Sequence, residues 1–315
     1  MGKSGYSPAM LPLVHHPAYV APLPNRHRFP MNKFAALIAL LRAEGLAGED
    51  NLHAPSPAPR WHLELVHDGD YVADMLEGTA SPATLRRIGL PWSPALAFRS
   101  RCAVAGTLLT AELALQHGIA CNTAGGSHHA RADGGAGYCV FNDVAVAARV
   151  LQARGRAQRM LVVDLDVHQG DGTARIFAGD PAVFTFSMHA ERNFPVRKAQ
   201  SDLDVPLPDG MADEAYLACL ADHLPALLAR ERPELVFYVA GVDPHGEDRL
   251  GRLALSDAGL ARRDAYVLRC CREQQIPVAG VLGGGYADDM AVLARRHALL
   301  HRSAAQLLDP AEATA

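Results

Sequence analysis

Apolar positions follow two different patterns through the last two thirds of this chain. Short, nearly continuous apolar runs, such as MLVVDL and LVFYVA, predict buried strands at 160–165, 183–188, 235–240 and 278–282. Between these runs the apolar residues recur at helical spacing, which predicts helices at 143–154, 213–230, 258–274 and 288–307. The less regular N-terminal third predicts two more helices, at 31–44 and 99–117.

Nearly all-apolar strands that alternate with helices are typical of a mainly parallel sheet covered by helices on both faces. No low-complexity segment, fixed-period repeat or long polar linker divides the chain, and the proline-rich stretch at 54–60 reads as a short loop. We therefore interpret residues 1–315 as one α/β domain with a mainly parallel central sheet.

Polar residues stand directly after three of the predicted strands. They are DLDVHQGD at 164–171, GVD at 241–243 and GGGY at 283–286. In open parallel sheets, ligands bind outside the carboxyl ends of the strands. The three clusters are therefore predicted to converge on one edge of the sheet and to form one site.

Three of these residues are candidate metal ligands. Asp166 and His168 share a face if the preceding strand runs on, and Asp243 is the natural third ligand. Two carboxylates and one imidazole leave an open position, as in catalytic zinc sites that polarise a carbonyl and activate water. Each fragment alone also has an ordinary explanation: D-x-H occurs by chance, and an aspartate after a strand often caps a helix.

The tandem histidines His128 and His129 follow a pair of glycines in a predicted loop. Many tandem histidines are simply solvated, but here Asp164 and Asp171 are free to accept one Nδ1 proton each. Such His–Asp pairs beside a metal-bound water supply a general base and a general acid. Tyr286 follows three glycines; it is either an oxyanion donor or an ordinary residue of a glycine-rich turn.

Composition and charge narrow the classes of protein to which the chain can belong. A formal net charge of −4 argues against a nucleic-acid platform, and no apolar run is long enough to predict a membrane span. The N-terminus has no apolar block of signal-peptide length, and the six cysteines show no CxxC pairing. These features predict a cytoplasmic enzyme without disulfide bonds.

With these residues in place, the sequence resembles the arginase–deacetylase superfamily and, within it, the histone deacetylases. The matching segments are GGSHHARADGGAGYCVFND, VVDLDVHQGDGT, AGVDPHGEDRLGRL and GVLGGGY, in the order of that family. Two more segments, HPAYVAPLPNRHRFPMNKF and RRIGLPWSPALAFRSR, look most like the class IV branch and its bacterial relatives. The resemblance implies the arginase/deacetylase fold and zinc-dependent hydrolysis of an acyl-lysine amide.

The resemblance also implies roles for individual residues. It makes Asp166, His168 and Asp243 the ligands of one Zn²⁺. His129, backed by Asp171, becomes the general base and acid, and His128, backed by Asp164, the second, electrostatic histidine. Tyr286 becomes the residue that polarises the scissile carbonyl.

Further positions match parts of the substrate path. The narrow tunnel for the acylated lysine corresponds to Gly137, Tyr138, Phe194 and Leu250, with Gly284 as a backbone position near the substrate. Arg28 resembles the arginine of an internal cavity through which the released acid leaves. The resemblance also implies a site for a monovalent cation such as K⁺, formed by the backbone at 164–168, which includes Asp164, Asp166 and His168, with Ser187 and Met188.

The chain departs from the family pattern at two places. Tyr138 stands where many members have Phe, which predicts a changed acyl or stem preference, and Gln169 replaces a common His. Cys139 we interpret as a packing residue.

Three other functions are compatible with parts of this pattern. A binuclear ureohydrolase like arginase needs a D-x-H-x-D core, but Gly170 occupies the last ligand position. A non-catalytic acyl-lysine binder is disfavoured because every catalytic position is filled. Hydrolysis of acetylpolyamines stays open. The expected partner is thus an acylated lysine peptide, protein or amine, without direct nucleic-acid contact; an oligomer is compatible with the sequence.

Overall fold

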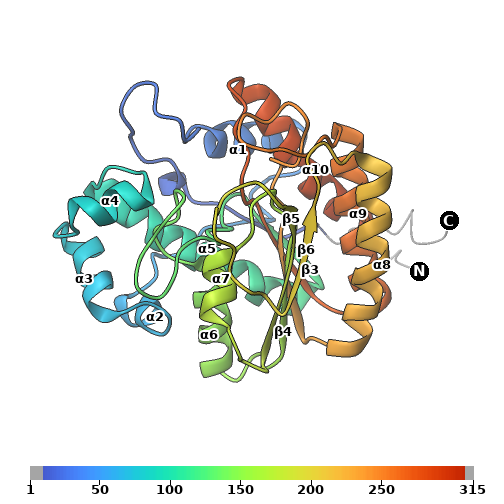
Figure 1. The fold of residues 1–315 in the computed structure, drawn as a ribbon, viewed down its shortest axis with the longest axis horizontal. Helices are drawn as coiled ribbons and strands as arrows, with labels where there is room; N and C mark the ends of the chain where they lie inside the picture. Colours follow the sequence, from blue (N-terminus) through green and yellow to red (C-terminus); the bar gives the residue numbers. More distant parts are fainter. Residues whose placement is uncertain (1–9, 309–315) are drawn as a thin grey trace, which may run out of the picture.

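A single parallel sheet of eight strands forms the centre of the molecule (Figure 1). The computed structural model describes residues 10–308. The strands follow the spatial order β2-β1-β3-β8-β7-β4-β5-β6, and all neighbours are parallel. Their bounds are β1 Leu13–Val14, β2 Leu52–His53, β3 Ile119–Asn122, β4 Met160–Asp164, β5 Val183–Ala190, β6 Leu203–Leu207, β7 Leu235–Val239 and β8 Val278–Val281. The predicted α/β class and parallel sheet are confirmed.

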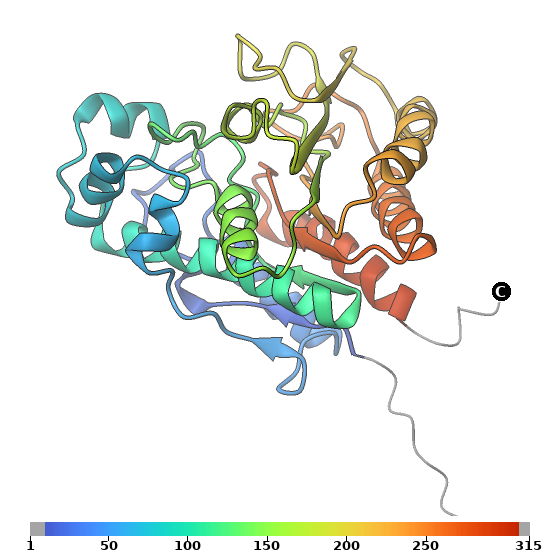
Figure 2. The ribbon, with the colours of Figure 1, turned by 90° about the horizontal axis from the view of Figure 1, so that it is seen from below.

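Helices cover both faces of this sheet. Their bounds are η1 Pro17–Tyr19, α1 Lys33–Ala43, α2 Arg60–Glu64, α3 Gly69–Glu77, α4 Pro82–Ile88, α5 Pro94–His117, α6 Asp143–Ala153, α7 Asp171–Ile176, α8 Asp213–Glu231, α9 Asp257–Glu273 and α10 Met290–Leu308. Figure 2 shows α5 and α6 on one side of the strands and α8, α9 and α10 on the other. Within residues 10–308, no helix has the length and apolar character needed to cross a membrane.

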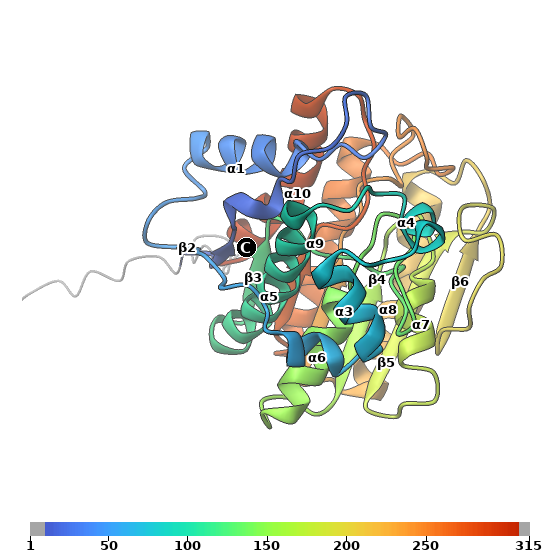
Figure 3. The ribbon, with the colours of Figure 1, turned by 90° about the vertical axis from the view of Figure 1, so that its left-hand side faces the viewer.

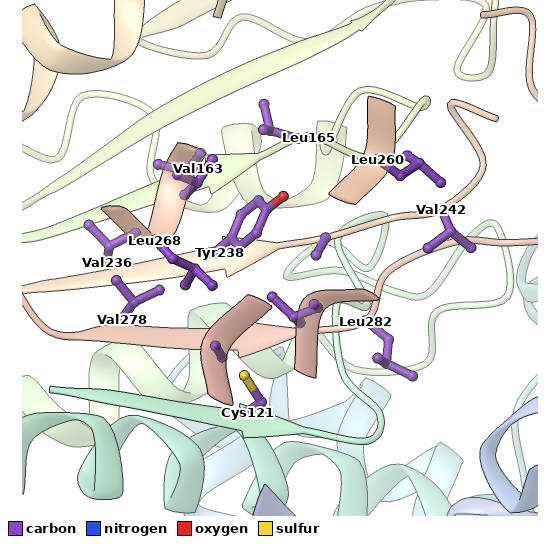
Figure 4. Close-up of a cluster of buried hydrophobic side chains, with 14 of the residues drawn as sticks. Cys121, Val163, Leu165, Val236, Tyr238, Val242, Leu260, Leu268, Val278 and Leu282 are labelled. Atoms are coloured by element: carbon purple, nitrogen blue, oxygen red, sulfur yellow. The ribbon is translucent and has the colours of Figure 1, made fainter. Parts of the chain in front are cut away.

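Alternate residues of each strand feed two hydrophobic cores, as the two-residue period of a strand requires. Val163, Val236 and Tyr238 pack with α8, α9 and α10 (Figure 4). Val162 and Phe237, from the same strands, pack on the opposite face with α5 and α6. This double burial explains why the strands read as continuous apolar runs in the sequence.

The predicted elements of the C-terminal half agree with the structure to within a few residues. One helix differs more: α5 begins at Pro94, not at residue 99. The Ser93 side chain accepts a hydrogen bond from the Leu96 amide, and Pro94 occupies the first turn, so the helix start was marked by a Ser-Pro signal. The strands β1, β2, β3 and β6 and the short helices α2, α3, α4 and α7 were not predicted. Figure 1 shows α2, α3 and α4 together on one side of the molecule, and Figure 3 views the molecule from that side.

Candidate active site

The residues predicted to bind a metal meet at the carboxyl edge of the sheet. Asp166, His168 and Asp243 are buried, and each offers a ligand atom within 4.8 Å of the others. His168 Nδ1 lies 3.0 Å from Asp166 Oδ1 and 3.1 Å from Asp243 Oδ2. One detail of the prediction is wrong: β4 ends at Asp164, so Asp166 and His168 converge through a bend in the following loop rather than through strand alternation.

Backbone amides fix the orientation of these carboxylates. Gly284 N–H donates to Asp166 Oδ2 at 2.6 Å, and Val167 N–H donates to Asp243 Oδ1 at 2.9 Å. A Cβ on Gly284 would collide with Asp243, so glycine permits this close approach. Asp243 Oδ2 is buried and makes no hydrogen bond, and its polar neighbour is the His168 ring nitrogen at 3.1 Å. Two carboxylates and an imidazole that converge in this way are a donor set that Zn²⁺ takes, so the residues fit a metal.

The predicted histidine–aspartate pairs are both formed. His128 Nδ1 lies 2.7 Å from Asp164 Oδ2, and His129 Nδ1 lies 2.8 Å from Asp171 Oδ1. Burial disfavours the charged form of His128, but the charges of Asp164 and Asp166 outweigh it and raise its pKa to about 9. Burial, aided by the neighbouring charge of His128, lowers the pKa of His129 to about 4. The surroundings therefore favour the protonated form of His128 and the neutral form of His129, the form that can accept a proton.

The two histidines face different spaces. His129 lines the cavity that opens to the surface, and its ring meets the Phe194 ring edge-on with centroids 4.8 Å apart. His128 lines only the inner cavity behind the metal residues. His129 lines the inner cavity as well, so it stands where the two spaces meet, whereas His128 lines the inner one.

Tyr286 lies beside His168 and completes the site. The two ring centroids are 6.3 Å apart, and the Tyr286 backbone N–H is held by Asp248 Oδ2 at 2.7 Å. Burial, together with the charges of Asp243 and Asp166, raises the pKa of Tyr286. The phenol therefore stays protonated and available as a hydrogen-bond donor.

The predicted tunnel residues surround an opening of about 290 Å³ that leads from the surface to the metal residues. Gly137, Tyr138, Phe194 and Leu250 all line it. Tyr138 adopts a left-handed backbone conformation with a φ of 66°, which is uncommon for a residue other than glycine and is typical of functional sites. Residues 86–89, at the C-terminal end of α4, form the remaining wall of this tunnel, and no sequence pattern had indicated that position.

Behind the metal residues lies an inner cavity of about 40 Å³. The prediction that Arg28 lines it is wrong: Arg28 is exposed and is not among the lining residues. The cavity instead contains Lys33, from the first turn of α1, and Arg99, from α5. Gly284, predicted to lie near the substrate, lines this cavity beside Asp166.

The residues of the predicted monovalent-cation site are also adjacent. Ser187 pairs with Asp164 across β4 and β5, and Met188 follows it, all three buried. Ser187 Oγ lies 2.9 Å from His189 Nδ1. The ion itself stays a prediction.

Arg263 is a support that the sequence did not reveal. Its buried guanidinium donates to the carbonyl oxygens of Leu165, at 3.2 Å, and Gly241, at 2.7 Å, and it pairs with Asp264 at 2.8 Å. Leu165 and Gly241 stand next to the loops that carry the metal residues. Arg263 thus ties these loops to α9. Its place in an ordinary amphipathic helix gave no hint of this role.

Comparison with known proteins agrees with this arrangement. Residues 27–301 match the family model described as histone deacetylase domain. The chain belongs to the histone deacetylase family. It is 55% identical over 293 residues to an uncharacterized protein of Picosynechococcus, covering 93% of this chain and 98% of that one. It is 31% identical over 275 residues to histone deacetylase 2 of Arabidopsis thaliana, covering 84% and 71% of the two chains.

Solved structures of this family share the fold. A crystal structure of a histone deacetylase homologue complexed with SAHA superposes with a TM-score of 0.82 at 27% identity, covering 95% of this chain and 84% of that one. The HD domain of HDA15 gives a TM-score of 0.80 at 20% identity, covering 95% and 89%. The arginase/deacetylase-type fold is thus confirmed, whereas the class IV assignment stays a prediction.

Proposed function

We propose that this deacetylase hydrolyses the amide of an acylated lysine side chain in a zinc-dependent reaction. The observation that carries the proposal is one constellation: the Asp166–His168–Asp243 group and the His129–Asp171 pair stand together at the bottom of a narrow tunnel. A tunnel of this kind suits a long, thin side chain whose reactive amide lies at its end. We further propose a cytoplasmic location.

Zinc bound by Asp166, His168 and Asp243 would polarise the acyl carbonyl and lower the pKa of a water molecule. Neutral His129 accepts the proton of the attacking water, and Asp171 holds its Nδ1. Protonated His129 then donates that proton to the leaving amine. The Tyr286 hydroxyl donates to the oxygen that becomes negative in the transition state.

The acid product leaves toward the inner cavity, where Lys33 and Arg99 provide two buried positive charges. A space of about 40 Å³ holds about three or four water molecules, by the usual requirement of roughly 10–15 Å³ for each. This volume favours an acetyl group over a long fatty acyl chain. A K⁺ ion bound at the Asp164–Ser187 position would stabilise the loop that carries Asp166.

The ureohydrolase alternative finds no support. Within residues 10–308, a single group of candidate metal ligands is found. At Gly170, where a second metal would need a carboxylate, an added Cβ would collide with Asp164.

The test is hydrolysis of two fluorogenic lysine peptides, one acetylated and one carrying a long fatty acyl chain. We expect activity on the acetylated peptide that a chelator abolishes and added zinc restores. Tyr286→Phe should lower the rate by roughly 10²–10³, the scale of one lost oxyanion donor. Tyr266→Phe, on the outer helix α9, serves as the matched control. Near-full turnover by Tyr286→Phe, or activity that survives chelation, would contradict the proposal.

A further inference from the structure

The outer opening of the tunnel combines apolar and positively charged side chains. Phe194 and Leu250 line it and are 44% and 36% exposed, although both are large and apolar. Arg86 and Arg87, in the last turn of α4, complete the same wall. Within the described residues, no acidic side chain lines this opening.

The backbone beside these two arginines is fixed to the tunnel wall. The Gly137 and Tyr138 amides donate to the carbonyl oxygens of Arg87, at 3.2 Å, and Ile88, at 2.7 Å. The Arg87 side chain is also held, because its Nε donates to the Gly135 carbonyl at 2.9 Å. Both arginines are exposed, but the Arg86 side chain makes no hydrogen bond or ion pair with residues 10–308. Its charge is therefore available to a molecule that enters the tunnel.

The segment that carries Phe194 adds further positive charge. Arg197 is exposed and has no ion pair with the described part of the chain. Lys198 donates to the carbonyl oxygens of Asn193 and Pro195, at 2.6 and 2.7 Å, and so remains close to the same segment.

Acids nearby offset part of this charge. Asp248 accepts from the backbone amides of Leu250, Gly251 and Tyr286, which leaves its negative charge in place, and Glu191 and Asp204 act on Lys198. Asp288 pairs with Arg249. The permanently charged side chains that line the opening itself, Arg86 and Arg87, are nevertheless both positive and stand beside an apolar rim, an arrangement that attracts anions and repels cations.

We propose that the tunnel selects acyl-lysine peptides with acidic residues beside the acylated lysine, and that it rejects cationic acylpolyamines. This inference rests on the proposed function and names the substrate class within it. The basic residues of α4 also interact favourably with the helix C-terminus, but that role alone predicts no effect on substrate choice.

The experiment compares three acetyl-lysine peptides of equal length, with acidic, neutral or basic flanking residues, and mono-acetylated spermidine. We expect kcat/KM to favour the acidic over the basic peptide by roughly tenfold at low salt. The preference should vanish near about 1 M salt, where the screening length is about 3 Å. Acetylspermidine should be a poorer substrate than the neutral peptide.

Charge reversal locates the effect. Arg86→Glu should cut the acidic-to-basic ratio by roughly threefold or more, and Arg86→Glu combined with Arg197→Glu should invert it. The matched control is Arg156→Glu, an exposed arginine between α6 and β4, at the amino edge of the sheet. It makes the same change in net charge and should leave the ratio unchanged. Thermal unfolding checks that each variant is folded.

The outcomes distinguish failure of this inference from failure of the proposed function. Hydrolysis of the neutral peptide without any preference for acidic flanks would overturn this inference alone. So would an equal effect of Arg156→Glu and Arg86→Glu, or faster hydrolysis of acetylspermidine than of the neutral peptide. Failure to hydrolyse any of the peptides would overturn the proposed function, and this inference with it.

Discussion

Two lysine or arginine side chains line each end of the tunnel, in opposite physical settings. At the inner end Lys33 is 1% and Arg99 is 7% exposed, and neither has an ion pair with residues 10–308. Lys33 Nζ donates only to the Gly283 carbonyl, at 3.1 Å, and Arg99 Nε donates to the Tyr19 carbonyl, at 2.8 Å. At the outer end Arg86 and Arg87 are exposed to solvent.

A positive charge therefore differs in stability cost and in role between the two ends of the tunnel. Burial lowers the pKa of Lys33 to about 8 and that of Arg99 to about 10, so each inner cation is held at a cost in stability. Such a cost is understandable if the cavity receives an anion. An exposed cation costs almost nothing and acts over a distance, on encounter and selection. The inner end is thus suited to binding the anionic product, and the outer end to selecting the substrate.

The largest effect is expected where the tunnel reaches the metal residues. His129→Asn should lower kcat/KM by roughly 10²–10⁴, because His129 is the neutral base that faces the tunnel. His128→Asn should cost clearly less, because His128 faces only the inner cavity. Steady-state kinetics on the acetylated peptide measures both. Equal losses for the two variants would mean that the two histidines share one role.

A second prediction concerns the segment 125–143, which contributes to both ends of the tunnel. His67 holds it: the Asn142 amide donates to His67 Nε2 at 3.0 Å, and His67 Nδ1 lies 2.9 Å from the Arg131 carbonyl. Burial lowers the pKa of His67 to about 4. In the unfolded chain histidine has a pKa of about 6.5. Below that pH His67 is therefore protonated in the unfolded state but stays neutral in the folded state.

The free energy of unfolding should therefore fall as the pH drops from about 6.5 to about 4, with up to about 3 kcal/mol from His67. Urea unfolding at several pH values measures the slope. His67→Gln should make the slope shallower, whereas His117→Gln, at an exposed helix end, should not. Parallel curves for the wild type and His67→Gln would contradict the prediction.

The smallest effects are expected from removing one positive charge at each end of the tunnel. Lys33→Met should raise the free energy of unfolding at neutral pH by about 2 kcal/mol, because it removes an unpaired buried charge. It should also weaken inhibition by acetate by roughly tenfold. Arg86→Met should change the stability by less than about 0.5 kcal/mol and leave acetate inhibition intact. Chemical denaturation and inhibition assays give both values. Destabilisation by Lys33→Met would show that Lys33 is a structural contact instead.

The amino-acid sequence by itself determined the sheet class and the residues of the chemical centre. Fully buried parallel strands leave continuous apolar runs, and their carboxyl ends must share one edge, so Asp166, Asp243 and Tyr286 could be grouped from local pattern alone. The His–Asp pairs followed because Asp164 and Asp171 were the spare acids nearest to that edge.

Only the tertiary structure decided which positively charged side chains line the tunnel. Strands β1 and β2 have two residues each, too few to show a period, yet they set where the N-terminal segment lies. Arg28 and Lys33 are five positions apart, and the start of α1 turns Lys33 inward and leaves Arg28 exposed. Whether a charged side chain points into a cavity depends on how its helix is rotated against the sheet. Packing of distant segments fixes that rotation, and local sequence does not encode it.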